Sequence, residues 1–413
     1  MGSRLQRKVM RLTDDTKNGK MRHMEQLLTR GVEQIIGREE LEKALAGKRK
    51  LRIKFGVDPT RPDIHIGHAV VLRQLRQFQD LGHTVIFLIG DYTTKIGDPS
   101  GKSKTRPVLD DVEIAANAKT YLDQVGQILD VKKAEIRYNS EWLSKLSFAD
   151  LLNLASNFSV AQLIERDDFK NRLESGLELS LHELLYPVMQ AYDSVALEAD
   201  VEFGGNDQLF NLMAGRSLQK KLGQNPQIVF VSELLVGTDG TKKMSKSLDN
   251  YIALTDEPID MYGKVMSIPD NLIGPYYKLC TEIAEEQIQA LVQTLAAGAN
   301  PRDSKASLAR EIVSMYHGED VALKAEEAWN NQFRDGAIPE EIEEFKIKDA
   351  HMSLVDLLVE TEMASSRGEA RRLIEQGGVK LDGTVQILES EPVLADGDIL
   401  QVGKRRYLKL RVK

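Results

Sequence analysis

Two apolar runs separated by a helical pattern constrain this chain more than any other feature. The first, Leu51–Val57, is β-branched and apolar and stops at Asp58 and Pro59, as a buried strand stops at a turn. Apolar residues then recur at helical intervals, at Val70, Val71, Leu75, Phe78 and Leu81. The second run, Thr84–Gly90, follows directly. The order strand, helix, strand predicts a right-handed parallel crossover and therefore an α/β sheet.

The chain has 413 residues, more than one hydrophobic core usually organises, so we expect several domains. Its start is polar and basic, which predicts a flexible arm. Further along, the apolar pattern changes from α/β to all-helical and then to short strands with turns. The predicted domains are an arm at 1–30, an α/β domain at 31–250 with a helical insertion at about 110–200, an α-helical domain at 251–345 and a small α+β domain at 350–413.

Local patterns predict the individual elements of these domains. Beyond the first two strands, strands are expected at Val201–Phe203 and Gln227–Val236, with an interruption of the helical insertion at Glu135–Asn139. Helices are expected at Glu183–Leu197, Ile283–Leu295, Ser304–Tyr316, Ser353–Glu360 and Arg367–Gln376. A linker is expected at Pro339–Lys348.

Composition excludes several classes of protein. No run of 18 or more apolar residues is present, which argues against a membrane role, and the start has no secretory signal. Cys280 is the single cysteine, which excludes an intramolecular disulfide and a multi-cysteine zinc site, and is consistent with a reducing cytosol. We therefore expect a cytoplasmic protein without a dedicated metal site.

The charge distribution leaves room for a nucleic-acid partner despite a net charge of −8. Six basic residues and no acidic residue fall within the last ten positions, at Lys404, Arg405, Arg406, Lys409, Arg411 and Lys413. A solvated basic tail and an RNA-binding patch both explain this cluster, so it decides nothing alone.

Two histidines stand where the loop after the first strand becomes a helix. His65 and His68 are three residues apart, so both imidazoles would project from the first turn toward the carboxyl edge of the sheet. The helix N-terminus favours anionic phosphates, and Gly67 leaves space for a nucleotide. Two incidental histidines remain an alternative. So does a nucleotidyltransferase that makes no aminoacyl product.

A lysine-rich loop follows the strand expected at Gln227–Val236. Lys242, Lys243 and Lys246 occupy three of five positions, and their ammonium groups repel one another unless an anion lies among them. A triphosphate is a suitable anion. A solvated surface loop is the alternative for a short lysine cluster.

Together the two elements resemble the signatures of class I aminoacyl-tRNA synthetases. The segment from His65 to His68 matches the HIGH signature, and Lys243 to Ser247 matches the KMSKS signature letter for letter. The resemblance implies a Rossmann-type catalytic domain that binds ATP with Mg²⁺, without a tightly bound cofactor. It also implies catalytic roles for His65, His68, Lys243 and Lys246.

A helix in the insertion carries polar residues on one face. Tyr186, Gln190 and Asp193 follow one another at i, i+4 and i+7, so a buried face of this kind needs hydrogen-bond partners or a ligand. A buried hydrogen-bond network satisfies the spacing equally well. The segment is, however, similar to the tyrosine-pocket helix of tyrosyl-tRNA synthetases, as are the segments 204–208 and 97–101.

This second resemblance implies roles for individual residues. The substrate ammonium would be held by Asp98, Tyr186 and Gln190, and the phenolic hydroxyl by Asp193. ATP and the adenylate would be bound by Gly56, Asp58, Thr60, Gly67, Gly205, Asp207, Gln208, Lys243, Ser245 and Lys246. A buried acceptor that phenylalanine leaves unpaired would discriminate between the two amino acids.

One departure from the family pattern concerns the hydroxyl end of the pocket. Lys54 stands where the better-known branch has a tyrosine, and Phe55 replaces a neighbouring cysteine. Lys54 is expected either to contact the ligand or to point away from it. A longer-chain bacterial branch of the family is similar in having this pattern, so the departure does not change the prediction that tyrosine is the substrate.

The last domain resembles the S4 RNA-binding domain. The resemblance covers Arg367 to Ile374 and Gly377 to Gly383, and implies that Arg367, Arg371, Arg372 and Lys380 bind RNA phosphates. The family also implies tRNA(Tyr), L-tyrosine and ATP as partners, and a homodimer formed through the insertion. The helical domain is expected to contact the anticodon arm.

Three alternatives remain open from the sequence. A tryptophanyl enzyme shares both signatures, but Asp193 suits a hydroxyl donor and the S4-like domain is atypical of it. A retired paralogue acting as an RNA-binding or splicing factor would have no reason to keep mutually repelling lysines. A small-molecule nucleotidyltransferase leaves the lysine loop and the basic C-terminal domain unexplained.

Overall fold

The computed structural model describes residues 24–60, 62–99, 109–333, 342–347, 349–388, 390, 393–403 and 406–412. Most of the arm predicted at 1–30 lies outside the described residues. The chain divides into two compact units, Met1–Leu323 and Lys324–Lys413. The boundary predicted near residue 250 falls inside the first unit, which extends to Leu323 and so includes most of the helical segment that follows the sheet.

Among the described residues, the first unit contains a six-stranded sheet in the order β1-β6-β5-β2-β3-β4. Its strands are β1 (Val32–Ile36), β2 (Arg52–Val57), β3 (Thr84–Ile89), β4 (Glu135–Tyr138), β5 (Val201–Gly205) and β6 (Ile228–Ser232). β2 to β6 pair in parallel, and β1 pairs antiparallel with β6. The parallel α/β sheet expected from the strand, helix, strand pattern is confirmed.

The strand order reverses between β2 and β5. From β2 the chain moves outward to β3 and β4, and it then returns to place β5 on the other side of β2. Lys54 of β2 lies beside Glu202 of β5 in this pairing. Open α/β sheets bind their ligands in the crevice at the carboxyl end of such a switch point.

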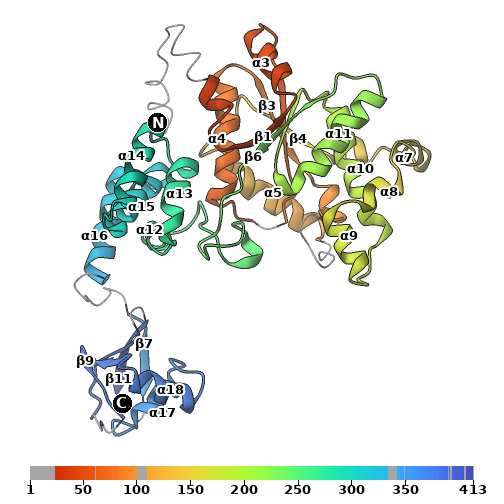
Figure 1. Cartoon of the computed structure of the whole chain (residues 1–413). Helices are drawn as coiled ribbons and strands as arrows, with labels where there is room; N and C mark the ends of the chain where they lie inside the picture. Colours follow the sequence, from red (N-terminus) through yellow and green to blue (C-terminus); the bar gives the residue numbers. More distant parts are fainter. Residues whose placement is uncertain are drawn as a thin grey trace. The chain divides into compact units, whose positions relative to one another are not determined.

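Helices cover both sides of this sheet. Figure 1 shows α4 (Ile66–Asp80) on one side and α11 (Leu209–Lys221) on the other. The other elements of this part are α3 (Arg38–Ala46), η1 (Thr93–Lys95), α5 (Asp111–Val125), α6 (Ser140–Leu143), α7 (Phe148–Ala155), α8 (Val160–Ile164), α9 (Asp167–Glu174), α10 (Leu181–Ala196), η2 (Asn206–Gln208) and η3 (Lys246–Leu248).

Aromatic packing joins α4 to the centre of the sheet. Phe78 on α4 meets Phe203 of β5 edge-on, with ring centroids 5.5 Å apart. Phe203 in turn stacks on Phe230 of β6 at 4.2 Å. All three side chains are buried, so this cluster fixes α4, the helix capped by His65, against the central strands of the sheet.

Helices continue after the sheet: α12 (Pro258–Met266), η4 (Asp270–Leu272), α13 (Ile273–Cys280), α14 (Glu285–Ala296), α15 (Pro301–His317) and α16 (Glu319–Phe333). The helices expected at Ile283–Leu295 and Ser304–Tyr316 are confirmed within a few residues. Cys280 is buried, as expected of a small core residue. Within the described residues, no helix is both long enough and apolar enough to cross a bilayer.

Within its described residues, the second unit contains a five-stranded sheet in the order β7-β11-β10-β8-β9, with two helices from the same region packed on a shared core. The elements are β7 (Glu344–Ile347), α17 (Leu354–Glu360), α18 (Arg367–Glu375), β8 (Val379–Leu381), β9 (Thr384–Val385), β10 (Ile399–Val402) and β11 (Arg406–Val412). Our linker prediction is wrong at β7, which pairs in parallel with β11. Ile347 is fully buried, and its apolar neighbours make this segment part of the domain.

Candidate active site

A cavity of about 600 Å³ opens at the carboxyl ends of β2 and β5. Every residue that the sequence analysis assigned to catalysis, to ATP or to tyrosine lines it. They come from the ends of the strands, the first turn of α4, one face of α10 and the lysine loop at 237–250. The fold therefore gathers one group of residues that are spread over about 190 positions of the sequence, from Gly56 to Lys246.

The two histidines form one end of this cavity. His65 caps α4, and its backbone N–H donates to His68 Nδ1 at 3.3 Å. Their ring centroids are 3.7 Å apart. Burial holds the pKa of His65 well below its usual range, assisted by His68 and two lysines. Burial and the same lysines, Lys246 and Lys243, lower the pKa of His68 to about 3, so both imidazoles are neutral at pH 7.

Both signature lysines contact protein acceptors across the cavity. Lys243 Nζ lies 2.5 Å from Oδ2 of Asp207, which belongs to η2 just after β5. Lys246 Nζ donates to the Tyr121 hydroxyl at 3.0 Å and lies 5.0 Å from the centroid of the same ring. Tyr121, on α5, was not predicted, because nothing near it in sequence marks it as a partner of the loop.

Asn250 organises the lysine loop from its far end. Its side chain donates to Asp239 Oδ2 at 2.8 Å and to the Lys243 carbonyl at 3.1 Å, and it accepts from the Ser245 N–H at 2.7 Å. A Cβ at Gly237 would lie only 2.2 Å from the Asn250 amide, so this close approach requires glycine. The KMSKS-like segment pointed to the two lysines as site residues, but it ends at Ser247 and gave no signal for Asn250.

The middle of the cavity joins the predicted adenylate and tyrosine residues. Tyr186 donates its hydroxyl to Asp58 Oδ2 at 2.9 Å, and Thr93 donates to Asp58 Oδ1 at the same distance. Gln208 donates to Asp98 Oδ2 at 2.8 Å. The first of these contacts places the carboxylate of Asp58, just after β2, beside the polar face of α10.

Asp193 lies at the buried end. It is 2% exposed, and it accepts from Trp142 Nε1 at 2.8 Å and from Asn139 Nδ2 at 3.3 Å. Burial raises the pKa of Asp193 to about 6, against the opposing effects of Lys54 and of the two donors. Trp142 was missed, because it lies in the insertion far from any motif.

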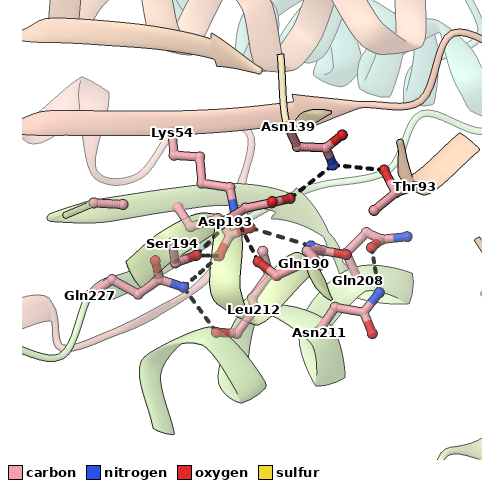
Figure 2. A network of polar contacts seen from close by, with 12 residues as sticks. Lys54, Thr93, Asn139, Gln190, Asp193, Ser194, Gln208, Asn211, Leu212 and Gln227 are labelled. Carbon is pink, nitrogen blue, oxygen red and sulfur yellow. Dashed lines mark hydrogen bonds and ion pairs between the residues drawn. The ribbon is translucent and has the colours of Figure 1, made fainter. Parts of the chain in front are cut away.

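Lys54 is fully buried next to this carboxylate (Figure 2). Its ammonium contacts Glu202 Oε1 at 2.9 Å, Ser194 Oγ at 2.9 Å and the Gln190 carbonyl at 3.2 Å. The sequence left open whether Lys54 contacts the ligand or points away. It borders the cavity while its three N–H bonds end on protein acceptors.

Phe55 is also buried and borders the cavity, 6.1 Å from Phe87 between ring centroids. Glu202 was missed as a partner of Lys54. Its signal was present, since a charged residue stands among apolar neighbours in each of the two strands, at Lys54 and Glu202.

The predicted RNA-binding residues lie in the second unit. Arg367, Arg371 and Arg372 are exposed on α18, and Lys380 is partly exposed on β8. Arg367 forms an ion pair with Asp356 of α17. Of the basic C-terminal cluster, Lys404, Arg405 and Lys413 lie outside the described residues.

Comparisons with known proteins agree with this geometry. Residues 45–334 match the model of the family "tRNA synthetases class I (W and Y)", and residues 352–399 match the S4 domain. Tyrosine–tRNA ligases of Thermotoga maritima and Moorella thermoacetica are 50% and 49% identical to the chain. The alignments cover 93% of this chain in both cases, and 96% and 94% of the two relatives.

Solved structures show the same fold. A C-terminally truncated mitochondrial tyrosyl-tRNA synthetase of Aspergillus nidulans superposes with a TM-score of 0.60 at 25% identity, over 74% of this chain and 91% of that one. A tyrosyl-tRNA synthetase of Archaeoglobus fulgidus, solved with L-tyrosine, gives 0.58 at 24% identity, over 73% and 98%. The chain thus belongs to the class I tRNA synthetases of the tyrosine and tryptophan type, among the tyrosine–tRNA ligases.

Proposed function

We propose that the chain activates L-tyrosine with ATP, releasing pyrophosphate, and transfers the tyrosyl group from the adenylate to the 3′ end of tRNA(Tyr) for protein synthesis. The observation that carries this proposal is that one cavity is lined by both groups of residues. This cavity has a buried carboxylate, Asp193, at one end, and two imidazoles with two lysines at the other. A phenol and a triphosphate have the chemistry that these two ends accept.

At the phosphate end, the protein contributes positioning and charge. Neutral His65 and His68 at the start of α4 donate hydrogen bonds, and the helix N-terminus favours anions. Lys243 and Lys246 neutralise charge that develops on the leaving pyrophosphate. Mg²⁺ would enter with the ATP substrate and would neutralise part of the charge of its phosphates. Gly56, Thr60, Gly67, Gly205 and Ser245 complete the nucleotide-binding wall.

At the tyrosine end, acidic and amide groups hold the amino acid. Asp98, Tyr186 and Gln190 face its ammonium group, and Asp193 accepts its phenolic hydroxyl. Asp58, Asp207 and Gln208 border the adenylate between the two ends. The substrate carboxylate is thereby held for in-line attack on the α-phosphate, and proximity supplies much of the rate.

Amino-acid-dependent pyrophosphate exchange tests this proposal. We expect exchange with tyrosine and much slower exchange with tryptophan or phenylalanine, because the indole is larger than the phenol and the phenyl ring brings no hydroxyl to donate to Asp193. Preferential exchange with tryptophan would assign the chain to the other specificity of the matched family. No exchange with any amino acid would favour a retired paralogue.

The second unit is proposed to bind tRNA through α18 and β8. Because β7 completes its sheet, a truncation should remove residues 342–413 together. We expect this truncation to spare tyrosyl-adenylate formation and to weaken tRNA charging. A full-length Arg371→Ala/Arg372→Ala variant should weaken charging in the same direction, with a reduced dependence on salt. Equal loss of adenylation and charging in the truncated protein would contradict the modular assignment.

A homodimer through the insertion is also proposed. Large apolar side chains are exposed on three of its helices, at Phe148 and Leu152 of α7, Val160 of α8 and Leu181 of α10. Such exposure favours an interface. A Phe148→Glu variant should shift the molar mass measured by light scattering toward that of a monomer, and an unchanged mass would locate the interface elsewhere. We assign the enzyme to the cytoplasm, where its single buried cysteine stays reduced.

A further inference from the structure

We propose, building on the tyrosine activation above, that the buried Lys54–Glu202 pair holds Asp193 in place, and that Lys54 keeps this carboxylate ionised as the acceptor for the phenolic hydroxyl. Lys54 is then a positioning residue that determines the discrimination between tyrosine and phenylalanine. It acts through Asp193 and not by touching the substrate.

The first argument is geometric. The three contacts of the Lys54 ammonium reach two elements, α10 through the Gln190 carbonyl and Ser194 Oγ, and β5 through Glu202. Asp193 lies between Gln190 and Ser194 on the same helical turn. Lys54 therefore ties that turn of α10 to the strands on either side of the switch point, and it fixes the carboxylate relative to the sheet.

Glu202 extends the same network to the other end of the substrate. Its Oε1 accepts from Gln190 Nε2 at 3.3 Å, and its Oε2 accepts from Ser194 Oγ at 3.0 Å and from Gln227 Nε2. A Cβ at Gly215 would lie 2.7 Å from Gln227 Nε2 and 3.3 Å from Glu202 Oε2, so α11 approaches closely only because glycine is present. One buried pair thus orients both Asp193 and Gln190.

The second argument is electrostatic. Among the described residues, the charged groups that act on Asp193 are Lys54 from β2, which favours its carboxylate, and Glu202 from β5, which opposes it. Trp142 of α6 and Asn139 at the end of β4 add neutral donors. Burial alone favours a protonated Asp193, and a protonated carboxyl is a poor acceptor for a phenol. Lys54 therefore opposes burial at the one group that recognises the hydroxyl.

The test compares two substitutions that should act in opposite directions. We would measure kcat/KM for tyrosine and for phenylalanine by pyrophosphate exchange between pH 5 and 9, since this parameter reports ionisations of the free enzyme. The acidic limb is the fall of kcat/KM for tyrosine toward low pH, which we attribute to protonation of Asp193. Lys54→Met removes the cation, so this limb should move up by about two pH units, which lowers kcat/KM at pH 7 roughly tenfold. Phenylalanine, which has no hydroxyl, should change much less, and the tyrosine preference should recover by pH 9.

Glu202→Gln removes the opposing anion and keeps the shape, so the acidic limb should move down by about one pH unit. Simple damage to the pocket would move both variants the same way or leave the limb unmoved, and either result overturns the proposal. If Lys54→Met does not fold, Glu202→Gln decides alone. A fall of kcat/KM for tyrosine at a lower pH than in the unmodified enzyme supports the proposal, and a fall at the same or a higher pH overturns it. Lys220→Met, an exposed lysine on α11, is the matched control. Lack of tyrosine exchange by the unmodified enzyme would instead refute the proposed function.

Discussion

The two ends of the cavity are built in opposite ways. At the phenol end, Asp193 and Lys54 are almost fully buried, and each is surrounded by partners from strands and helices. At the phosphate end, Lys243 is exposed and Lys246 is partly exposed, and both reach across the cavity, Lys243 to Asp207 and Lys246 to Tyr121.

This difference corresponds to two tasks. Recognition of a hydroxyl requires an acceptor that is already in place and dry, because the penalty for leaving it unpaired provides the discrimination. Stabilisation of a leaving pyrophosphate requires cations that engage most strongly in the transition state. Lysines that can exchange a protein acceptor for a phosphate suit that second task.

The largest expected effect is at the rigid end. Asp193→Ala should lower kcat/KM for tyrosine about 100-fold, because a charged hydrogen bond worth about 3 kcal/mol is lost. Activation of phenylalanine should change far less. Exchange assays with both amino acids measure the two losses, and Asp123→Ala on the exposed side of α5 serves as the control. Equal losses for the two substrates would mean that Asp193 supports the pocket without reading the hydroxyl.

The loop should respond differently. Lys246→Ala should lower the rate of adenylate formation at least about tenfold, equivalent to about 1.4 kcal/mol, and change the ATP dissociation constant less. Stopped-flow measurement separates the two quantities. Lys242→Ala, in the same loop but outside the cavity lining, should be nearly silent. If Lys246→Ala instead loses ATP affinity while the rate of adenylate formation stays the same, Lys246 binds ATP in the ground state, as the residues at the phenol end are expected to bind tyrosine.

A smaller effect is expected at the contact that holds Lys246. Tyr121→Phe removes the hydroxyl acceptor and keeps the ring, so it releases a hydrogen bond that the lysine gives up to reach a phosphate. We expect adenylate formation to accelerate a few-fold, by less than about 1 kcal/mol. The same substitution in a Lys246→Ala background should have no effect. A slower single variant would show that Tyr121 orients the lysine during the reaction.

The sequence predicted the phosphate end better than the phenol end for a physical reason. His65, His68 and the lysine loop are contiguous strings whose local backbone already places the side chains together. Lys54, by contrast, has partners 136 to 148 positions away, and only the pairing of β2 with β5 brings them close. Such contacts depend on strand order, which periodicity in the sequence does not provide.

The same distinction explains the errors in secondary structure. The buried strands were predicted because continuous apolar runs identify them. β1 was missed, because it is a half-exposed edge strand whose pattern is interrupted by a register shift between Val32 and Gln34. β7 was taken for a linker, because its sequence alternates charged and apolar residues over only four positions. Both strands depend on a partner strand that is distant in the chain.

The smallest expected effect concerns stability at the phosphate end. The pKa of His68 is lower in the folded chain than in the unfolded one, so folding is fully favoured above the ordinary histidine pKa and loses stability as pH falls below it. His68→Asn keeps an acceptor for the His65 N–H and removes this titration. Denaturant unfolding at pH 7.5 and pH 6 should therefore show a smaller acid-induced loss for the variant.

The difference should be less than about 1 kcal/mol at pH 6, because His68 borders a cavity that water can enter. The exposed His182→Asn on α10 should keep the pH dependence of the unmodified chain. If His68→Asn also keeps it, the imidazole is not held neutral by its surroundings. The acidic limb of tyrosine activation should stay with Asp193 in both histidine variants, since neither histidine is among the groups that act on the pKa of Asp193.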